Sequence, residues 1–152
     1  MKEDRKIGDV TLNFSFSEFK VSEDHPELAK RIILTPKDKA KILYMCLHFL
    51  QPLRDETDNI VDVLSAKRSI PLNTAVGGEE YSDHLFRGFY SCAADIFPYA
   101  ISDPNSDWDV ERIIEWFKAK GGFKQLIWYS QKNFFHLAPF TLTPKEKQIL
   151  YF

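Results

Sequence analysis

Cysteine is scarce in this sequence, with only Cys46 and Cys92 among its 152 residues. The two do not form a CxxC pair, which argues against a zinc site built from cysteine thiolates. Cys46 lies in an apolar stretch, and we expect both cysteines to be buried thiols. The sequence alone leaves a disulfide between them open.

Long apolar runs and an excess of one charge are also missing. No apolar run approaches the roughly 20 residues that a membrane-spanning helix needs. Residues 1–10 are polar and lack the apolar core of a secretory signal. The net charge is −2, so no basic excess points to nucleic acid. We therefore expect no transmembrane segment, no signal peptide in this chain and no nucleic-acid partner, while the oligomeric state stays open.

The sequence does contain enough apolar residues for one compact domain over residues 1–152, because 44% of them are hydrophobic and 14% aromatic. Helices are predicted after the N-cap Thr35, over 69–76, and from a capping box of Ser106 and Asp109 to Gly121. Strands are predicted over 60–64, 89–97, 123–129 and 134–137. This order of elements predicts an α+β fold, a small sheet with helices packed on it.

Three further expectations concern single segments. The helix after residue 35 should bury an apolar face whose members recur at helical spacing: Leu43, Cys46, Leu47, Leu50 and Leu53. Residues 13–19 predict a short strand or a capped turn. Residues 143–152 predict a short helix or a docking tail, because they end on apolar side chains.

Two of the four histidines stand out by their context. His84 lies in a polar stretch that follows Gly77-Gly78, and His136 interrupts an aromatic strand. A buried imidazole in such a strand needs a polar partner. Two imidazole nitrogens and a carboxylate oxygen suit zinc, and three such ligands leave a fourth position for water. Composition alone does not select these residues, because two histidines and an aspartate occur together in most chains.

Seven short motifs, taken in order, resemble the M15 metallopeptidases, the group of D-alanyl-D-alanine carboxypeptidases and phage endolysins. They are Ser65–Ser69, Leu72-Asn73, Val76–Gly78, Ser82–His84, Ala93–Ile96, Gln125–Ile127 and Phe135-His136. Each is unspecific alone, but their order is specific, and the match runs from about Asn13 to Leu137. The resemblance implies the Hedgehog/DD-peptidase fold, in which helices flank a small antiparallel sheet.

The resemblance also implies a site. The family's Ser-x-His motif falls on Ser82 and His84, its Ala-x-Asp motif ends on Asp95, and its later strand histidine is His136. His84, Asp95 and His136 would hold one zinc ion per chain, and Ser82 would bind the substrate peptide. The family's Ser-x-x-Arg motif ends on Arg68, where a guanidinium can clamp a carboxylate or stabilise an oxyanion. A surface ion pair is the alternative role for Arg68.

The sequence departs from the family pattern in two places. Ten residues, 85–94, separate His84 from Asp95, where the family usually has six. The family also places a glutamate shortly before the last histidine as general base, and the position three before it is Asn133. An amide cannot accept a proton from water, and a general base is typically worth roughly 10²–10⁴-fold in rate. Glu79 and Glu80 are the candidates to replace it.

These observations leave three readings of the function. The first is a zinc peptidase that hydrolyses an amide bond of peptidoglycan stem peptides next to D-alanine. The second is a non-catalytic module that keeps the metal and binds cell-wall peptide or a protein. The third has no metal, with His84 and His136 as structural histidines. The location stays open between the cytoplasm, where the chain is made, and the cell wall after release.

Overall fold

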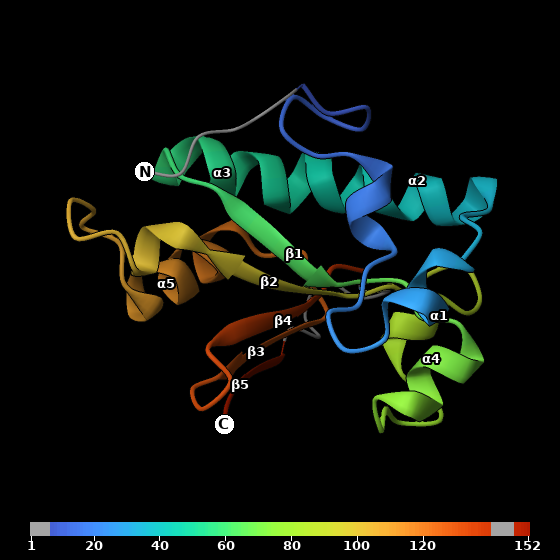
Figure 1. The fold of residues 1–152 in the computed structure, drawn as a ribbon. Helices are drawn as coiled ribbons and strands as arrows, with labels where there is room; N and C mark the ends of the chain where they lie inside the picture. Colours follow the sequence, from blue (N-terminus) through green and yellow to red (C-terminus); the bar gives the residue numbers. More distant parts are fainter. Residues whose placement is uncertain (1–6, 141–147) are drawn as a thin grey trace.

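The computed structural model describes residues 7–140 and 148–152 and contains one five-stranded sheet (Figure 1). Its strands are β1 (Val61–Ser65), β2 (Ala94–Pro98), β3 (Gln125–Tyr129), β4 (Phe134–Ala138) and β5 (Gln148–Tyr151). Their order is β1-β2-β4-β3-β5, and every neighbouring pair is antiparallel except β3 and β5. The predicted α+β class with a small, mostly antiparallel sheet is confirmed, and β5 adds one parallel pair to it.

Short helices surround the sheet. They are α1 (Pro26–Lys30), α2 (Pro36–Met45), α3 (Gln51–Thr57), α4 (Ile70–Ala75) and α5 (Val110–Lys120), with 3-10 helices η1 (Phe16–Phe19), η3 (Asp83–Leu85) and η4 (Tyr99–Ile101). A π-helical segment, η2 (Cys46–Leu50), joins α2 to α3, so the three form the long helix at the top of Figure 1. The π-helical segment ends two residues before Pro52, which has no N–H to donate.

The long helix begins where the sequence predicts. The N–H of Asp38 donates to Thr35 Oγ1 at 3.1 Å, and the Asp38 carboxylate accepts from the N–H of Thr35 at 2.9 Å. These reciprocal bonds satisfy two backbone donors at the helix start. The predicted buried face is partly wrong, because Leu43 is 40% and Leu47 54% exposed. The buried face is shifted by one position and consists of Ile42, Met45, Cys46, Phe49, Leu50 and Leu53.

Four other local predictions meet mixed outcomes. Residues 16–19 form a capped 3-10 turn, with Glu18 accepting from the N–H of Ser15. Helix α4 begins after Ser69, as predicted. The strand expected over 89–97 is confined to β2, and residues 89–93 form turns and irregular backbone. Helix α5 is capped by Asp109 alone, since Ser106 instead accepts from the N–H of Trp108.

The C-terminal prediction is settled only in part. The part of that segment before residue 148 lies outside the described residues, and Gln148–Tyr151 forms β5, so a helix there is wrong. Strand β5 pairs with β3, and the tail therefore docks on its own sheet. Both cysteines are buried free thiols, and burial raises the pKa of each. In the ranges described, no helix is long and apolar enough to cross a membrane.

The two faces of the sheet differ. One carries the core, in which Ile96, Leu126, Phe135 and Leu137 pack with the buried face of the long helix and with α5. The other face carries the residues that alternate with these, among them Asp95, Ile127 and His136. The polar residues singled out in the sequence therefore lie on the face away from the core.

Candidate metal centre

Asp95 and His136 meet because their strands pair. The two residues lie directly opposite each other in the antiparallel ladder of β2 and β4. Side chains that face each other across such a ladder lie on the same face of the sheet, within contact distance. His136 Nδ1 lies 2.9 Å from Asp95 Oδ1.

His84 reaches the same place from the 3-10 turn η3. The Ser82 hydroxyl caps this turn by accepting from the N–H of His84 at 3.2 Å. The backbone carbonyl of His84 accepts from the N–H of Arg68 at 2.7 Å. Nδ1 of the His84 ring lies 2.7 Å from the carbonyl oxygen of Ala66. His84 is thus fixed by the segment that leaves β1.

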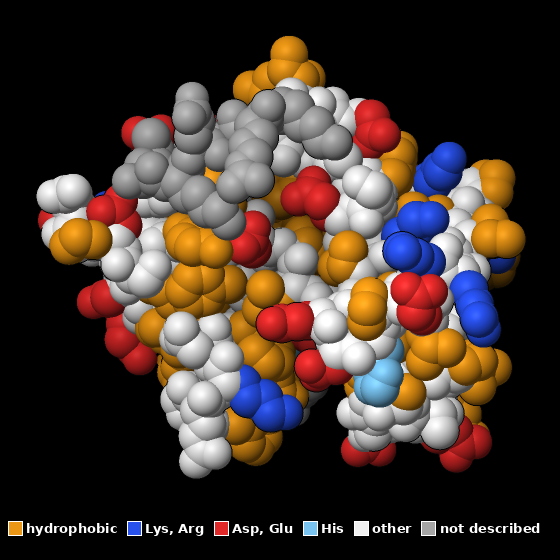
Figure 2. Space-filling view, viewed as in Figure 1, with side chains coloured by type: hydrophobic (Ala, Val, Ile, Leu, Met, Phe, Trp, Pro, Cys, Tyr) orange, Lys and Arg blue, Asp and Glu red, His pale blue; other side chains and the backbone are white. Residues whose placement is uncertain are grey.

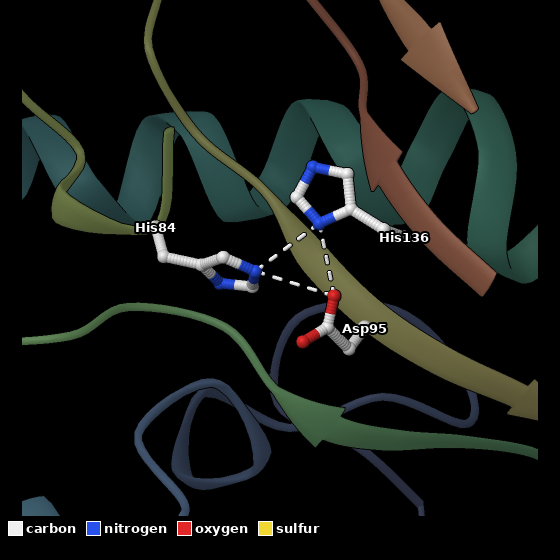
Figure 3. Close-up of side chains that lie close together, drawn as sticks. All are labelled: His84, Asp95 and His136. Carbon is white, nitrogen blue, oxygen red and sulfur yellow. Dashed lines mark hydrogen bonds and ion pairs between the residues drawn. The ribbon is translucent and has the colours of Figure 1, made fainter. Parts of the chain in front are cut away.

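The three side chains converge on one point (Figure 3). His84 Nε2 lies 3.2 Å from Asp95 Oδ1 and 3.2 Å from His136 Nδ1. Zinc bonds of about 2.0–2.1 Å in tetrahedral geometry place ligand atoms roughly 3.3 Å apart. The observed separations therefore suit three ligands of one zinc ion.

The hydrogen bond from His84 Nδ1 to Ala66 supports the same conclusion. A carbonyl oxygen can only accept, so the bond to Ala66 places the ring proton of His84 on Nδ1. The other ring nitrogen, Nε2, faces Asp95 Oδ1 at 3.2 Å. His84 is 3% and Asp95 7% exposed, so little water reaches them. Nε2 and Asp95 Oδ1 need a positive charge between them, either a proton on Nε2 or a metal ion, and histidines that bind metals typically donate their other N–H to such a carbonyl.

Asp95 is suited to carry the negative charge of the cluster. Burial raises the pKa of its carboxyl group, but the charge of His84 and hydrogen bonds from both imidazoles lower it by more. The net pKa lies well below the usual range of an aspartate. The carboxylate is therefore ionised at neutral pH and available as a ligand.

Arg68 lies beside the cluster and is not on the open surface. Its Nη2 is 3.5 Å from Asp95 Oδ2, its Nε donates to Ser65 Oγ at 3.3 Å, and its Nη1 donates to Asn73 Oδ1 at 3.4 Å. The side chain is 14% exposed. Asn73 Oδ1 packs directly against Gly78. A Cβ at position 78 would lie 2.1 Å from that oxygen, so this contact requires glycine. The expectation of a surface ion pair is wrong in its location, since this pair is mostly buried.

The carboxylates proposed to replace the family's glutamate are not in the cluster. Glu79 and Glu80 are exposed, and among the described residues the group of potential metal ligands contains only His84, Asp95 and His136. Asn133 is exposed too and lies in the tight turn between β3 and β4, with φ of +59°. Asparagine tolerates this left-handed conformation better than glutamate does.

The sequence analysis missed Tyr129. It lies two residues along β3 from Ile127, which is directly opposite His136, so it shares the face of the cluster. Burial raises the pKa of Tyr129, and the negative charge of Asp95 adds to this shift. Its phenol keeps its proton at neutral pH and can donate a hydrogen bond. Strand alternation in the predicted β3 was the signal that could have found it.

The long segment between His84 and Asp95 is held to the long helix by Lys41. Lys41 is 2% exposed, and its ammonium donates to the carbonyls of Phe86, Gly88 and Ser91 at 2.9, 2.8 and 2.8 Å. Ser91 Oγ also donates to Asp83 at 3.0 Å. The extra residues therefore form an anchored loop beside the cluster and do not displace His84 or Asp95 from it.

Comparison with known proteins identifies the family. The model of the family described as Peptidase M15 matches residues 14–138. The chain belongs to the M15 peptidase family. No match is found among curated proteins. M15 peptidases are typically zinc-dependent, and the described residues of this member provide a cluster that could hold the metal.

Proposed function

We propose that this M15 family member is a zinc-dependent peptidase that hydrolyses an amide bond of peptidoglycan stem peptides next to D-alanine. His84, Asp95 and His136 would hold one zinc ion. The observation that carries the proposal is the convergence of His84 Nε2, His136 Nδ1 and Asp95 Oδ1 within 3.2 Å of one another. The family match supports the class of reaction.

The metal, when bound, polarises the scissile carbonyl and activates water for attack on it. The protein residues around it position both reactants. Asp95 uses Oδ1 toward the cluster and Oδ2 toward Arg68. The guanidinium of Arg68 therefore lies next to the reacting groups, where it can bind the substrate carboxylate or the developing oxyanion. Ser82 fixes His84, and its hydroxyl can still donate to the peptide.

Proton transfer would need a group other than the glutamate that the family places before the last histidine, because Asn133 stands there in this chain. Tyr129 keeps its proton, so it can donate a hydrogen bond on the face of the cluster but cannot act as a base at neutral pH. In the described part of the chain, no second acidic side chain joins Asp95 in the cluster. This observation favours a second candidate, a module that keeps the metal and binds cell-wall peptide without cleaving it.

A single experiment separates the two candidates. Zinc-loaded protein is incubated with a synthetic stem peptide ending in D-alanyl-D-alanine, and free D-alanine is measured by mass spectrometry. Peptide binding is measured on the same samples by calorimetry. The peptidase proposal predicts release of D-alanine that disappears in His136→Ala. Binding without release would overturn it in favour of the binding module, and neither binding nor release would contradict both.

A further inference from the structure

A basic pocket of about 350 Å³ lies beside the metal centre, between α1 and the start of α4. Four of its lining side chains are cationic: Arg31, Lys67, Arg68 and Arg87. Most of the others are apolar, and no acidic side chain of the described residues lines it. Figure 2 shows Lys and Arg side chains gathered over the part of the molecule where Figure 1 places α1 and the start of α2.

Two of the four cations already have partners. Lys67 forms an ion pair with Asp38, and Arg68 forms one with Asp95. Within residues 7–140 and 148–152, neither Arg31 nor Arg87 has an acidic partner for its guanidinium. Two unpaired guanidinium groups around one pocket create a positive potential that favours an anion.

The backbone around Arg87 is held in place, although the Arg87 side chain is exposed. Lys41 binds the carbonyls of Phe86 and Gly88, the residues on either side of Arg87. Phe86 is itself buried, with 5% of its surface exposed. The loop that is longer than the family pattern therefore presents Arg87 at the pocket from a fixed backbone, and a preorganised group loses less entropy on binding.

The pocket and the metal centre share residues. Arg68 lines the pocket and contacts Asp95, and Leu85, which also lines it, directly follows His84. A peptide bound at the metal can therefore extend along Arg68 into the pocket. A group that enters there meets guanidinium donors above apolar side chains such as Ile32 and Ile70.

We infer that Arg31 and Arg87 form a subsite for a carboxylate of the peptide substrate. The inference rests on the proposed function, because it assumes that a peptide binds at the metal. Guanidinium groups bind carboxylates through paired, charge-assisted hydrogen bonds. Two sources of carboxylate fit this chemistry: the C-terminus of the peptide, one residue beyond the scissile bond, and an acidic side chain within the stem.

The test compares three peptides on the full zinc-loaded chain. The first is the stem peptide with both carboxylates free, the second has an amidated C-terminus, and the third has its acidic side chain amidated. Affinity is measured by calorimetry and cleavage by mass spectrometry, for wild type, Arg31→Gln, Arg87→Gln and the double variant. Arg112→Gln is the matched control, because Arg112 lies on α5, far from α1 and α4 in Figure 1.

We expect the double variant to bind the free-acid peptide about tenfold more weakly, since charge-assisted hydrogen bonds are the strong ones. One of the two amides should show the same loss with wild type, which identifies the source of the carboxylate. Arg112→Gln should bind like wild type, and high salt should weaken wild type more than the double variant. Circular dichroism checks that each variant is folded.

Equal affinity of wild type and the double variant for the free-acid peptide would overturn the subsite. So would wild-type binding of both amides as tight as that of the acid, or no binding of the acid at all. Arginine-dependent binding without cleavage would uphold the subsite and contradict the peptidase proposal. Cleavage that does not depend on Arg31 and Arg87 would uphold the peptidase proposal and contradict the subsite.

Discussion

The protein buries two polar groups, the ammonium of Lys41 and the cluster of His84, Asp95 and His136, and they differ in the partners that they meet. Lys41 directs its ammonium at three backbone carbonyls, one for each of its protons. The cluster directs ring nitrogens of His84 and His136 at one carboxylate oxygen, Oδ1 of Asp95. Each proton of the Lys41 ammonium has an acceptor in the described structure, whereas the cluster brings together three atoms that can act as ligands of a metal ion.

This difference separates a structural role from a functional one. A buried polar group that finds all its partners within the protein stabilises one conformation. A buried cluster of ionisable side chains that converge on one point is instead a candidate for a functional site. Lys41 therefore holds the loop between η3 and β2, and the cluster is the candidate to bind zinc. Substitution of Lys41 should therefore destabilise the protein itself, whereas substitution of a cluster residue should remove its stabilisation by zinc.

Lys41→Met should cause the largest loss of stability. Methionine has a similar length but leaves the carbonyls of Phe86, Gly88 and Ser91 without their donor. We expect the free energy of unfolding in urea to fall by roughly 3–5 kcal/mol, as when one partner of a buried ionic group is removed. The control is Lys39→Met on the same helix, whose ammonium contacts only the ring of Phe16 among the contacts described.

Lys39→Met should cost at most about 1 kcal/mol, since an exposed cation–π contact contributes little. Equal losses for the two variants would show that Lys41 matters only as an apolar stem. The claim that the Lys41 ammonium holds the loop through its three hydrogen bonds would then be wrong.

Zinc should raise the free energy of unfolding, because the three ligands come together only in the folded protein. A ligand that binds only the folded state at about a hundred times its Kd adds roughly 2.7 kcal/mol to the free energy of unfolding. Thermal denaturation with and without zinc measures this gain, which should be absent in Asp95→Asn. Stabilisation of the variant equal to that of wild type would place the zinc elsewhere.

The sequence predicted the cluster better than its surroundings. His84, Asp95 and His136 come from a loop and two strands, and only the order of the family motifs linked them. The pattern could not show that Asp95 and His136 pair directly, because strand register depends on contacts between distant segments. It also could not show Lys41 as a buried anchor, since a lysine in an amphipathic helix normally indicates the solvent face.

The fold was predictable where the signals were local. Thr35 and Pro36 mark a helix start through capping chemistry that involves only neighbouring residues. The strand β5 was not predictable, because it forms only by pairing with β3. The buried face of the long helix was displaced by one residue, since several apolar residues in a row allow more than one register.

Arg68→Lys should have a smaller effect, about tenfold in kcat/KM, if the proposed peptidase activity is present. Lysine keeps the charge beside Asp95 but loses the planar fork that contacts Ser65, Asn73 and Asp95 together. Peptide hydrolysis and zinc content are measured on the same preparation. An unchanged kcat/KM with full zinc would show that only the charge of Arg68 matters.

Asn133→Glu should have the smallest effect, a loss of about 1 kcal/mol in stability from the left-handed conformation. It restores a glutamate three residues before His136, yet position 133 is exposed in a turn. We therefore expect no gain in peptide hydrolysis. A gain of roughly 10²-fold or more, the scale of a general base, would show that this position does reach the reacting water.

The most direct test is the zinc content of purified protein by elemental analysis, for wild type, His84→Ala and His136→Ala. His48→Ala is the control, because His48 lies on the long helix and its ring contacts that of Tyr44. We predict about one zinc per chain in wild type and the control, as a three-ligand site requires, and none in the other two. No zinc in wild type after addition at neutral pH, or full zinc in both variants, would contradict the assignment of His84 and His136 as ligands.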